Sequence, residues 1–141
     1  MRNSAFTLVE ILIVVIILGI LAAIVIPQFT QASNDARTNA LASDLQTVRS
    51  QIQLYKVQHL DNFPGTTIAT VLISRTNNAG IVGTDPNAFP YGPYLMKMPT
   101  NAYQASNAVK TSGAAGSGSE GWCYDPASGA FNANDADHVN Y

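Results

Sequence analysis

One carboxylate in this sequence could take part in specific charge pairing, because it stands at the start of a long apolar stretch. Glu10 is followed by sixteen residues, 11–26, that carry no polar side chain. An ionised carboxylate within a hydrophobic membrane span costs on the order of 2.5–3.5 kcal/mol near the helix centre and less near an end. That cost is reduced if Glu10 stays hydrated at the interface or meets a cation. Residues 6–26 contain no Lys, Arg or His, so a cationic partner must come from outside these side chains.

The sequence is poor in the other residue types that catalyse reactions or bind metals. Its one cysteine, Cys123, allows no intrachain disulfide and no cysteine-rich zinc site. Its two histidines, His59 and His138, lie far apart, and neither belongs to an H-x-x-x-H pair. The glycine-rich phosphate-binding pattern and the G-x-S-x-G nucleophile pattern are both missing. These observations argue against an enzyme.

The charge balance argues against a second class of function. The 141 residues include seven Lys and Arg and nine Asp and Glu, which gives a formal net charge of −2. The basic residues are scattered along the chain, so no basic patch is available for a nucleic-acid backbone. We therefore expect no specific nucleic-acid partner.

Oxygen donors gather near the C-terminus. The residues from Glu120 to Tyr141 include four acids and no Lys or Arg. The donors of the type that calcium prefers are Asp125, Asn132, Asn134, Asp135 and Asp137. Their spacing does not match an EF-hand, because the Gly and the closing Glu are missing. A structural calcium site and a solvated acidic tail are both open interpretations.

The element that positions Glu10 is predicted to be a membrane-spanning helix. The stretch from Phe6 to Ile26 has 21 residues, and a helix of that length spans about 30 Å, the thickness of a bilayer core. Gly19 and Ala23 form a small-xxx-small pair, which is a packing surface for another helix in lipid. Pro27 removes one backbone donor and should kink or loosen the preceding turn.

The residues before the apolar stretch suggest a possible cationic partner for Glu10. Only residues 1–5 precede the stretch, and Arg2 is their one charged side chain, which favours a cytoplasmic N-terminus. A cut after Ala5 would leave a new α-amine on Phe6, four residues from Glu10. That amine could pair with Glu10 of its own chain or of a neighbouring copy. Pairing between copies would fix their axial stagger, because two opposite charges are tolerated in an apolar medium only when they meet.

The sequence Ala5-Phe6-Thr7-Leu8-Val9-Glu10, followed by a long aliphatic helix, resembles the class III signal of type IV pilins and type II secretion pseudopilins. The resemblance covers roughly residues 1–60. It implies that a membrane peptidase cuts before Phe6 and methylates the new amine, and that Glu10 is the conserved assembly glutamate. The family usually has Gly before the cut, whereas this chain has Ala5, a small substitute. In filaments of the family, the stretch corresponding to 19–27 often loses helical order.

The helix is predicted to continue beyond the apolar stretch with two different packing faces. One stripe steps by four and three residues, as expected for an amphipathic helix: Leu41, Leu45, Val48, Ile52 and Tyr55. An earlier set lies on a different side: Phe29, Ala32, Ala36 and Ala40. We expect the earlier set to contact other helices and the later stripe to contact the chain's own globular head. Charged residues such as Asp44, Arg49 and Lys56 are predicted to be solvated.

The remaining residues predict a small head. Pro and Gly end the helix at 62–65. We expect a short helix over 66–75, a loop over 77–93, a strand over 94–98, a flexible small-residue loop over 112–119 and a hairpin over 121–131 around the turn Asp125-Pro126-Ala127-Ser128-Gly129. A head of about 60–141 is too small for a large core of its own, so a small sheet should pack on the second half of the long helix.

Together, the residues and the resemblance predict an α+β pilin-like fold with four parts: a cleaved leader 1–5, a transmembrane and filament-core helix 6–26, its amphipathic continuation 27–60 and a head 61–141. The expected function is a structural subunit of a pilus-like filament, with no catalytic activity and no required cofactor. The short head and acidic end favour a major pseudopilin of type II secretion, for which the resemblance also implies a structural calcium. A type IV pilin and a non-polymerising membrane-anchored domain are the alternatives.

The resemblance also implies the partners and the location. The expected partners are further copies of the chain, membrane lipid before assembly, a prepilin peptidase and methyltransferase, an inner-membrane platform protein, an assembly ATPase, and minor pilins or pseudopilins. The expected location is the bacterial inner membrane, crossed once with a cytoplasmic N-terminus, followed by a periplasmic or surface filament.

Overall fold

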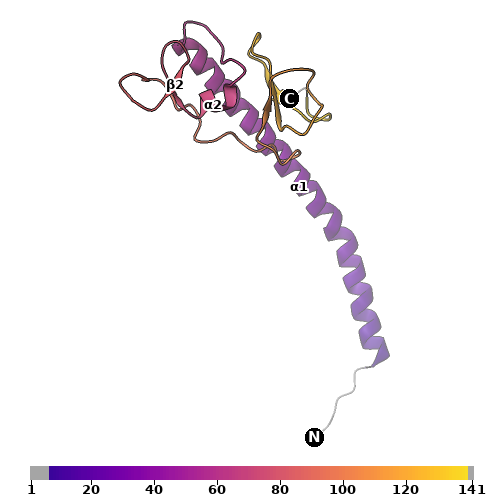
Figure 1. Cartoon of the computed structure of the whole chain (residues 1–141). Helices are drawn as coiled ribbons and strands as arrows, with labels where there is room; N and C mark the ends of the chain where they lie inside the picture. The colour runs from indigo at the N-terminus through magenta and orange to yellow at the C-terminus, as the bar shows by residue number, and fades with distance from the viewer. Residues whose placement is uncertain (1–6, 140–141) are drawn as a thin grey trace. The chain divides into compact units, whose positions relative to one another are not determined.

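The computed structural model describes residues 7–139 and places one long helix before a small α+β head (Figure 1). The chain divides into two compact units, residues 1–36 and residues 37–141. Helix α1, Leu8–Gln58, begins in the first unit and ends in the second. The predicted α+β, pilin-like fold class is thereby confirmed.

The first unit is helical along its apolar stretch. α1 is long and apolar enough to cross a membrane, judged by length and composition. Every described residue from Thr7 to Ala36 is exposed in the single chain. Aliphatic side chains that would ordinarily fill a protein core are therefore exposed along this unit.

The second unit has its core along one stripe of α1. The buried residues of α1 are Leu41, Leu45, Val48, Ile52 and Tyr55. The first four of them pack with α2 and the C-terminal strands into one apolar cluster, and Tyr55 stacks on His59. This is the predicted stripe, and its burial confirms that the second half of the helix packs on the head.

The segment after α1 contains a short helix and a two-stranded sheet. Leu60 and Asp61 take positive φ angles of 55° and 63°, which end the helix. Helix α2, Ile68–Leu72, lies within the helix predicted over 66–75 and is shorter than predicted. Strand β1, Arg75–Thr76, pairs antiparallel with β2, Val82–Gly83, so the predicted loop over 77–93 contains a short strand.

The strand predicted over 94–98 is wrong. The segment is irregular, and the backbone amides of Tyr94 and Leu95 both donate to the Leu72 carbonyl at 2.9 Å. Those amides cap the end of α2 and cannot join a strand ladder. Pro93 and Pro99 flank the segment and supply no backbone donor. The apolar residues of this segment therefore belong to a bent connection, in which Met98 is buried and Met96 is exposed.

The C-terminal strands form the second sheet. Strand β3, Val109–Lys110, pairs parallel with β4, Trp122–Tyr124, and β4 pairs antiparallel with β5, Phe131–Ala133. The β4–β5 hairpin is the predicted one, but the parallel β3 makes the sheet mixed instead of purely antiparallel. The rings of Trp122 and Phe131 stack at a centroid distance of 5.4 Å within the core.

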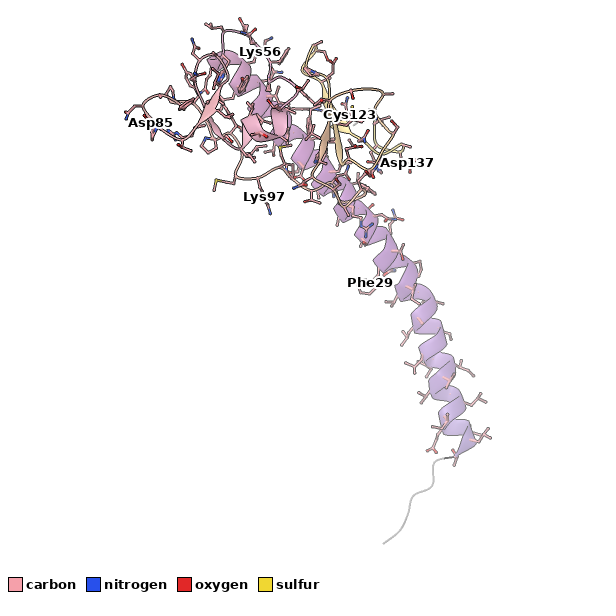
Figure 2. All side chains as sticks on the ribbon, viewed as in Figure 1. Phe29, Lys56, Asp85, Lys97, Cys123 and Asp137 are labelled. Atoms are coloured by element: carbon pink, nitrogen blue, oxygen red, sulfur yellow. The ribbon has the colours of Figure 1, made fainter. Side chains whose placement is uncertain are left out.

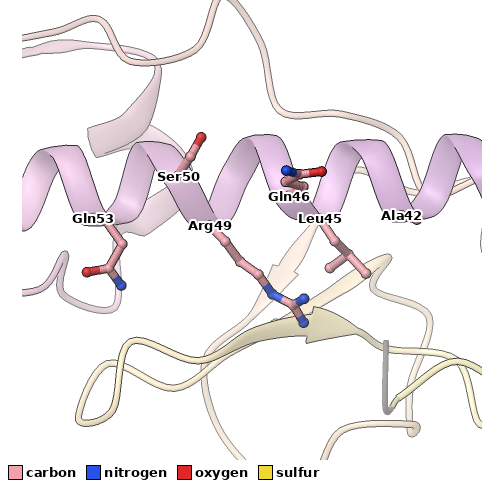
Figure 3. Close-up of a pocket in the computed structure, with 6 residues that line it drawn as sticks. All are labelled: Ala42, Leu45, Gln46, Arg49, Ser50 and Gln53. Carbon is pink, nitrogen blue, oxygen red and sulfur yellow. The ribbon is translucent and has the colours of Figure 1, made fainter.

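The prediction that Arg49 is a solvated helix residue is also wrong. Its Nε donates to the Phe131 carbonyl at 2.8 Å, and its Nη2 donates to Asn132 Oδ1 at 2.9 Å. Figure 3 shows the side chain pointing from α1 toward the strands, at a groove lined by Ala42, Leu45, Gln46, Arg49, Ser50 and Gln53. The guanidinium therefore joins helix α1 to strand β5.

Candidate functional site

The first turn of α1 is closed by two polar residues that bond to each other. Thr7 donates to Glu10 Oε2 twice, from its backbone amide at 2.8 Å and from its hydroxyl at 2.7 Å. The backbone amide of Glu10 donates in return to Thr7 Oγ1 at 3.3 Å. This reciprocal arrangement is a capping box, in which an N-cap Thr and an acid three residues later satisfy two orphan amides.

The capping box gives Glu10 partners within its own chain. The carboxylate also lies at the positive end of the helix dipole, where negative charge is stabilised. The sequence had predicted that Glu10 stays hydrated at the interface or meets a cation, and a bond to Thr7 was not among these expectations. The signal was present, because a Thr followed three residues later by Glu before an apolar stretch is the pattern of a capping box.

An uncovered apolar surface follows the capping box along α1. A shallow hollow there is lined by Thr7, Leu8, Ile11, Leu12 and Val15. Gly19, predicted to be part of a packing surface with Ala23, has no atom near the position a Cβ would take. A neighbouring helix could therefore approach the backbone closely at Gly19. A surface of this kind is stable only when lipid or other apolar surface covers it.

Pro27 lies inside α1 and leaves a gap in the hydrogen-bond ladder. Because proline has no N–H, the carbonyl of Ala23 lacks its usual partner four residues later. The helix nevertheless continues on both sides of Pro27. Thr30 Oγ1 donates to the Ile26 carbonyl at 3.2 Å in the same turn, and the exposed Phe29 lies beside it (Figure 2). Loosening of this turn in a filament stays a prediction.

The predicted cleavage and methylation residues, Ala5 and Phe6, lie outside the described residues. Processing between them and pairing of the Phe6 amine stay predictions. The structure describes only the acidic side of the expected charge pair.

Asp125 belongs to the hairpin turn and has local partners. Its carboxylate accepts from the Ser128 hydroxyl at 2.5 Å and from the Ala127 amide at 3.0 Å. These hydrogen bonds, led by that of Ser128, lower the pKa of Asp125 below its ordinary value. The backbone of Asp125 pairs with Ala130 across the turn, so Asp125 lies at the closed end of the β4–β5 hairpin.

The other predicted calcium ligands are not gathered around Asp125. The backbone amide of Asn134 donates to Gly121 at the open end of the same hairpin, and the neighbouring Asp135 contacts His138 and Asn101. Asn132 bonds to Arg49, and Asp137 is exposed. Within residues 7–139, no group of three or more His, Cys, Asp or Glu could hold a metal ion. Calcium binding stays a prediction.

His59 and Cys123 have structural positions in the head. The ring of His59 is buried and stacks on Tyr55 at a centroid distance of 3.7 Å. Its two nitrogens lie 2.8 Å from the Tyr55 carbonyl and 3.0 Å from Thr76 Oγ1. Cys123 is partly buried on β4, and this burial raises the pKa of its thiol. Neither residue is part of a nucleophile–base pair in the described contacts.

A comparison with known protein families matches the N-terminal segment. A family model described as the prokaryotic N-terminal methylation motif matches residues 1–26. The match spans the capping box, the apolar stretch, Gly19 and Ala23. It also includes Ala5 and Phe6, the residues at the predicted cut.

Curated relatives extend the similarity into the head. The type II secretion system core protein G of Pseudomonas aeruginosa is 33% identical over 106 residues, which cover 72% of this chain and 69% of that protein. The protein of the same name from Dickeya chrysanthemi is 27% identical over 113 residues, 79% of this chain and 71% of that protein. The type IV narrow pilus major component PilA5 of Thermus thermophilus is 43% identical over 61 residues, 41% of this chain and 50% of that protein. No solved structure matches the chain.

Proposed function

Because this chain belongs to the family of type II secretion system core protein G, we propose that it is a structural subunit of a helical filament, the pseudopilus of a type II secretion system. The observation that carries the proposal is the long apolar surface of α1, which is exposed in the single chain. At its N-terminal end lies the Glu10 carboxylate, which accepts hydrogen bonds from Thr7. The chain would contribute packing surface and charge pairing, not catalysis.

Two environments can cover the apolar surface of residues 8–26 in turn. Before assembly, lipid would surround the helix as a single membrane span. In the filament, neighbouring copies would replace the lipid. Lipid tails and apolar side chains are similar solvents for Leu and Ile, so little hydrophobic free energy separates the two states. Close packing at small residues and specific polar contacts must therefore select the filament.

Glu10 provides such a polar contact. In the single chain, its carboxylate is already satisfied by Thr7, which keeps the charge at the helix end. After cleavage between Ala5 and Phe6, the new amine of a neighbouring copy would offer a full positive charge. An ion pair in an apolar core is favourable only with good geometry, so one axial stagger between helices would be preferred. Assembly would exchange hydrogen bonds within one chain for charge pairing between chains.

The family membership also suggests the machinery. We propose that a prepilin peptidase removes residues 1–5 and methylates Phe6, and that a platform protein and a cytoplasmic ATPase extract the helices from the inner membrane. Arg2 on the short N-terminal side supports a cytoplasmic N-terminus. The head, residues 61–141, would then lie in the periplasm and coat the filament. Minor pseudopilins would be its further partners.

A type IV pilin of a surface fibre is the second candidate. The similarity to the Thermus pilus component favours it, but covers 41% of this chain, whereas the similarity to the Pseudomonas protein covers 72%. Deletion of the chain's gene in the producing cell separates the two. Loss of exoproteins from the medium with normal surface fibres supports the pseudopilus. Loss of surface fibres or twitching with normal secretion supports the pilus.

Filament formation is tested by carboxylate variants in the producing cell. Cells carrying the unaltered chain, Glu10→Ala, Glu10→Asp or the control Asp35→Ala are separated into membrane and sheared-fibre fractions. Glu10→Ala should insert normally and reduce fibre yield by more than about tenfold. The variant would leave the Phe6 amine of the neighbouring copy without its partner, and an unpartnered charge in an apolar core costs about 3–5 kcal/mol. Glu10→Asp should be milder. Asp35→Ala removes an exposed carboxylate from the same helix and should change nothing.

Two results would contradict this proposal. Normal fibre yield from Glu10→Ala would remove charge pairing from the mechanism. Absence of fibres from cells that make and process the unaltered chain would favour a non-polymerising, membrane-anchored domain.

A further inference from the structure

One partly exposed lysine of the head donates hydrogen bonds to oxygen atoms of the loop that follows it. Lys110 is the last residue of β3, and the chain turns back around its side chain before entering β4. Its Nζ donates to the Ala114 carbonyl at 3.1 Å, to the Ser117 carbonyl at 2.9 Å and to Ser117 Oγ at 2.7 Å. An ammonium group has three N–H donors, and these three oxygens match that number.

The path of the loop allows this arrangement. Gly113 and Gly116 have φ angles of 80° and 82°, which L side chains rarely adopt. These two residues let the backbone curl around the lysine. A Cβ placed on Gly113 would lie 3.6 Å from Cε and 3.7 Å from Nζ of Lys110, so a side chain at this position would contact the lysine. The residues 112–119, predicted to be a flexible loop, thus have specific internal partners.

A buried asparagine holds the other side of the same loop. Asn134 is 0% exposed. Its Oδ1 accepts from the Gly116 amide at 3.0 Å, and its Nδ2 donates to the carbonyls of Ser117 and Glu120, both at 3.0 Å. The Ser117 carbonyl therefore accepts from both Lys110 and Asn134. Lys110 at the end of β3 and Asn134 directly after β5 thus both donate to the polar backbone of the loop.

The donor set for the calcium that the resemblance implies does not fit this arrangement. Calcium takes six to eight oxygen ligands, usually including carboxylates. Here Asn134 is fully used by the loop, Asp125 lies at the opposite end of the hairpin, and the inward carbonyls face a cation that the chain itself provides. A calcium ion among those carbonyls would be repelled by the nearby ammonium.

We propose that Lys110, together with Asn134, orders the loop between β3 and β4 in this chain, and that the head folds without a structural calcium ion. The Lys110 ammonium donates to the loop oxygens at any calcium concentration. The inference concerns the head alone. It does not depend on whether the chain forms a pseudopilus, a surface pilus or no filament.

Thermal unfolding of the full chain in detergent micelles tests the proposal. With excess EGTA or with millimolar calcium chloride, the unaltered chain should unfold at temperatures within about 1 °C of each other, since a ligand that does not bind cannot stabilise. Lys110→Met should lower the Tm by roughly 5 °C in both solutions. It should also increase proteolytic cutting between 112 and 119. The matched control is Lys97→Met, which removes an exposed lysine from another loop (Figure 2).

A calcium titration of the unaltered chain by calorimetry provides a second measurement that needs no variant to fold. We expect no saturable heat up to millimolar calcium. Saturable binding, or a Tm that falls by several degrees when EGTA is added, would overturn the proposal. A Lys110→Met chain as stable and as resistant to protease as Lys97→Met would overturn it as well.

Discussion

The carboxylate of Glu10 accepts two hydrogen bonds from Thr7, one from the backbone amide at 2.8 Å and one from the hydroxyl at 2.7 Å. The residue expected to pair between subunits is therefore also the residue that caps its own helix. This relationship lets the free subunit keep a charge at the edge of an apolar helix without a foreign partner.

Removal of the Thr7 hydroxyl separates capping from charge pairing. Thr7→Val keeps the size of the side chain and the backbone amide but loses the cap, which should destabilise the first turn by about 1 kcal/mol. Because assembly exchanges this hydrogen bond for the pair between chains, fibre yield should stay near that of the unaltered chain, in contrast to Glu10→Ala. Thr7→Ser restores a hydroxyl and is the control, and gel mobility confirms that each variant is processed. A loss as severe as that of Glu10→Ala would mean that Thr7 has a direct role between subunits.

Arg49→Lys should destabilise the head. The guanidinium donates to the Phe131 carbonyl and to Asn132 Oδ1 at the same time. The single ammonium group of a lysine cannot reproduce these two parallel hydrogen bonds. Leaving a partly buried carbonyl without its donor costs about 1–3 kcal/mol. The Tm of the full chain in micelles should fall by several degrees. Arg37→Lys, at an exposed position of the same helix, should leave it unchanged. Equal Tm values for both variants would contradict the joining role of Arg49.

Two leucines of α1 form a matched pair for testing the core. Leu45 is 1% exposed and Leu54 is 44% exposed. Leu45→Ala should cost about 2–5 kcal/mol of unfolding free energy, because it leaves a cavity between helix and sheet. Leu54→Ala should cost much less. Denaturant unfolding in micelles measures both values, and similar costs would contradict the packing of the stripe on the head.

The hairpin turn should contribute a pH-dependent stability. Hydrogen bonds from Ser128 and Ala127 lower the pKa of Asp125 in the folded chain. Because the folded pKa lies below the unfolded value of about 3.9, the stabilisation is present above that value and is lost as the pH falls through the folded pKa. The Tm difference between the unaltered chain and Asp125→Asn should therefore be largest near neutral pH and shrink below about pH 4.

The control for the turn is Asp137→Asn, at an exposed acid of the C-terminal segment (Figure 2). It should leave the Tm at neutral pH close to that of the unaltered chain. A difference for Asp125→Asn that does not change between neutral and acid pH would contradict the assignment.

The features that sequence predicted well depend on strong periodic signals or on a complete local motif. The buried stripe from Leu41 to Tyr55 follows helical spacing, and the hairpin follows its Asp-Pro-x-x-Gly turn, with Gly129 at a φ of 73°. The apolar stretch after Glu10 indicated a surface that needs other molecules to cover it. Such local patterns predict the structure well because no tertiary contact opposes the local preference.

The features that sequence missed depend on contacts between distant residues. Arg49 is unremarkable on a helix, and only the position of β5 supplies its acceptors, 82 and 83 residues away. Lys110 likewise finds its oxygens only because Gly113 and Gly116 curl the loop. The Thr7–Glu10 pair was different, since its spacing was readable. A neutral donor three residues earlier satisfies the Glu10 carboxylate without a cation.

The mass of the N-terminal peptide, taken from sheared fibres of the producing cell, tests the central claim most directly. The account predicts fibres that contain this chain and a peptide that begins with N-methylated Phe6, the residue whose amine is to meet Glu10 of a neighbour. The contrary result is a chain found only in membranes, with residues 1–5 still attached and no fibre that contains it. That result would show a membrane-anchored domain and not a filament subunit.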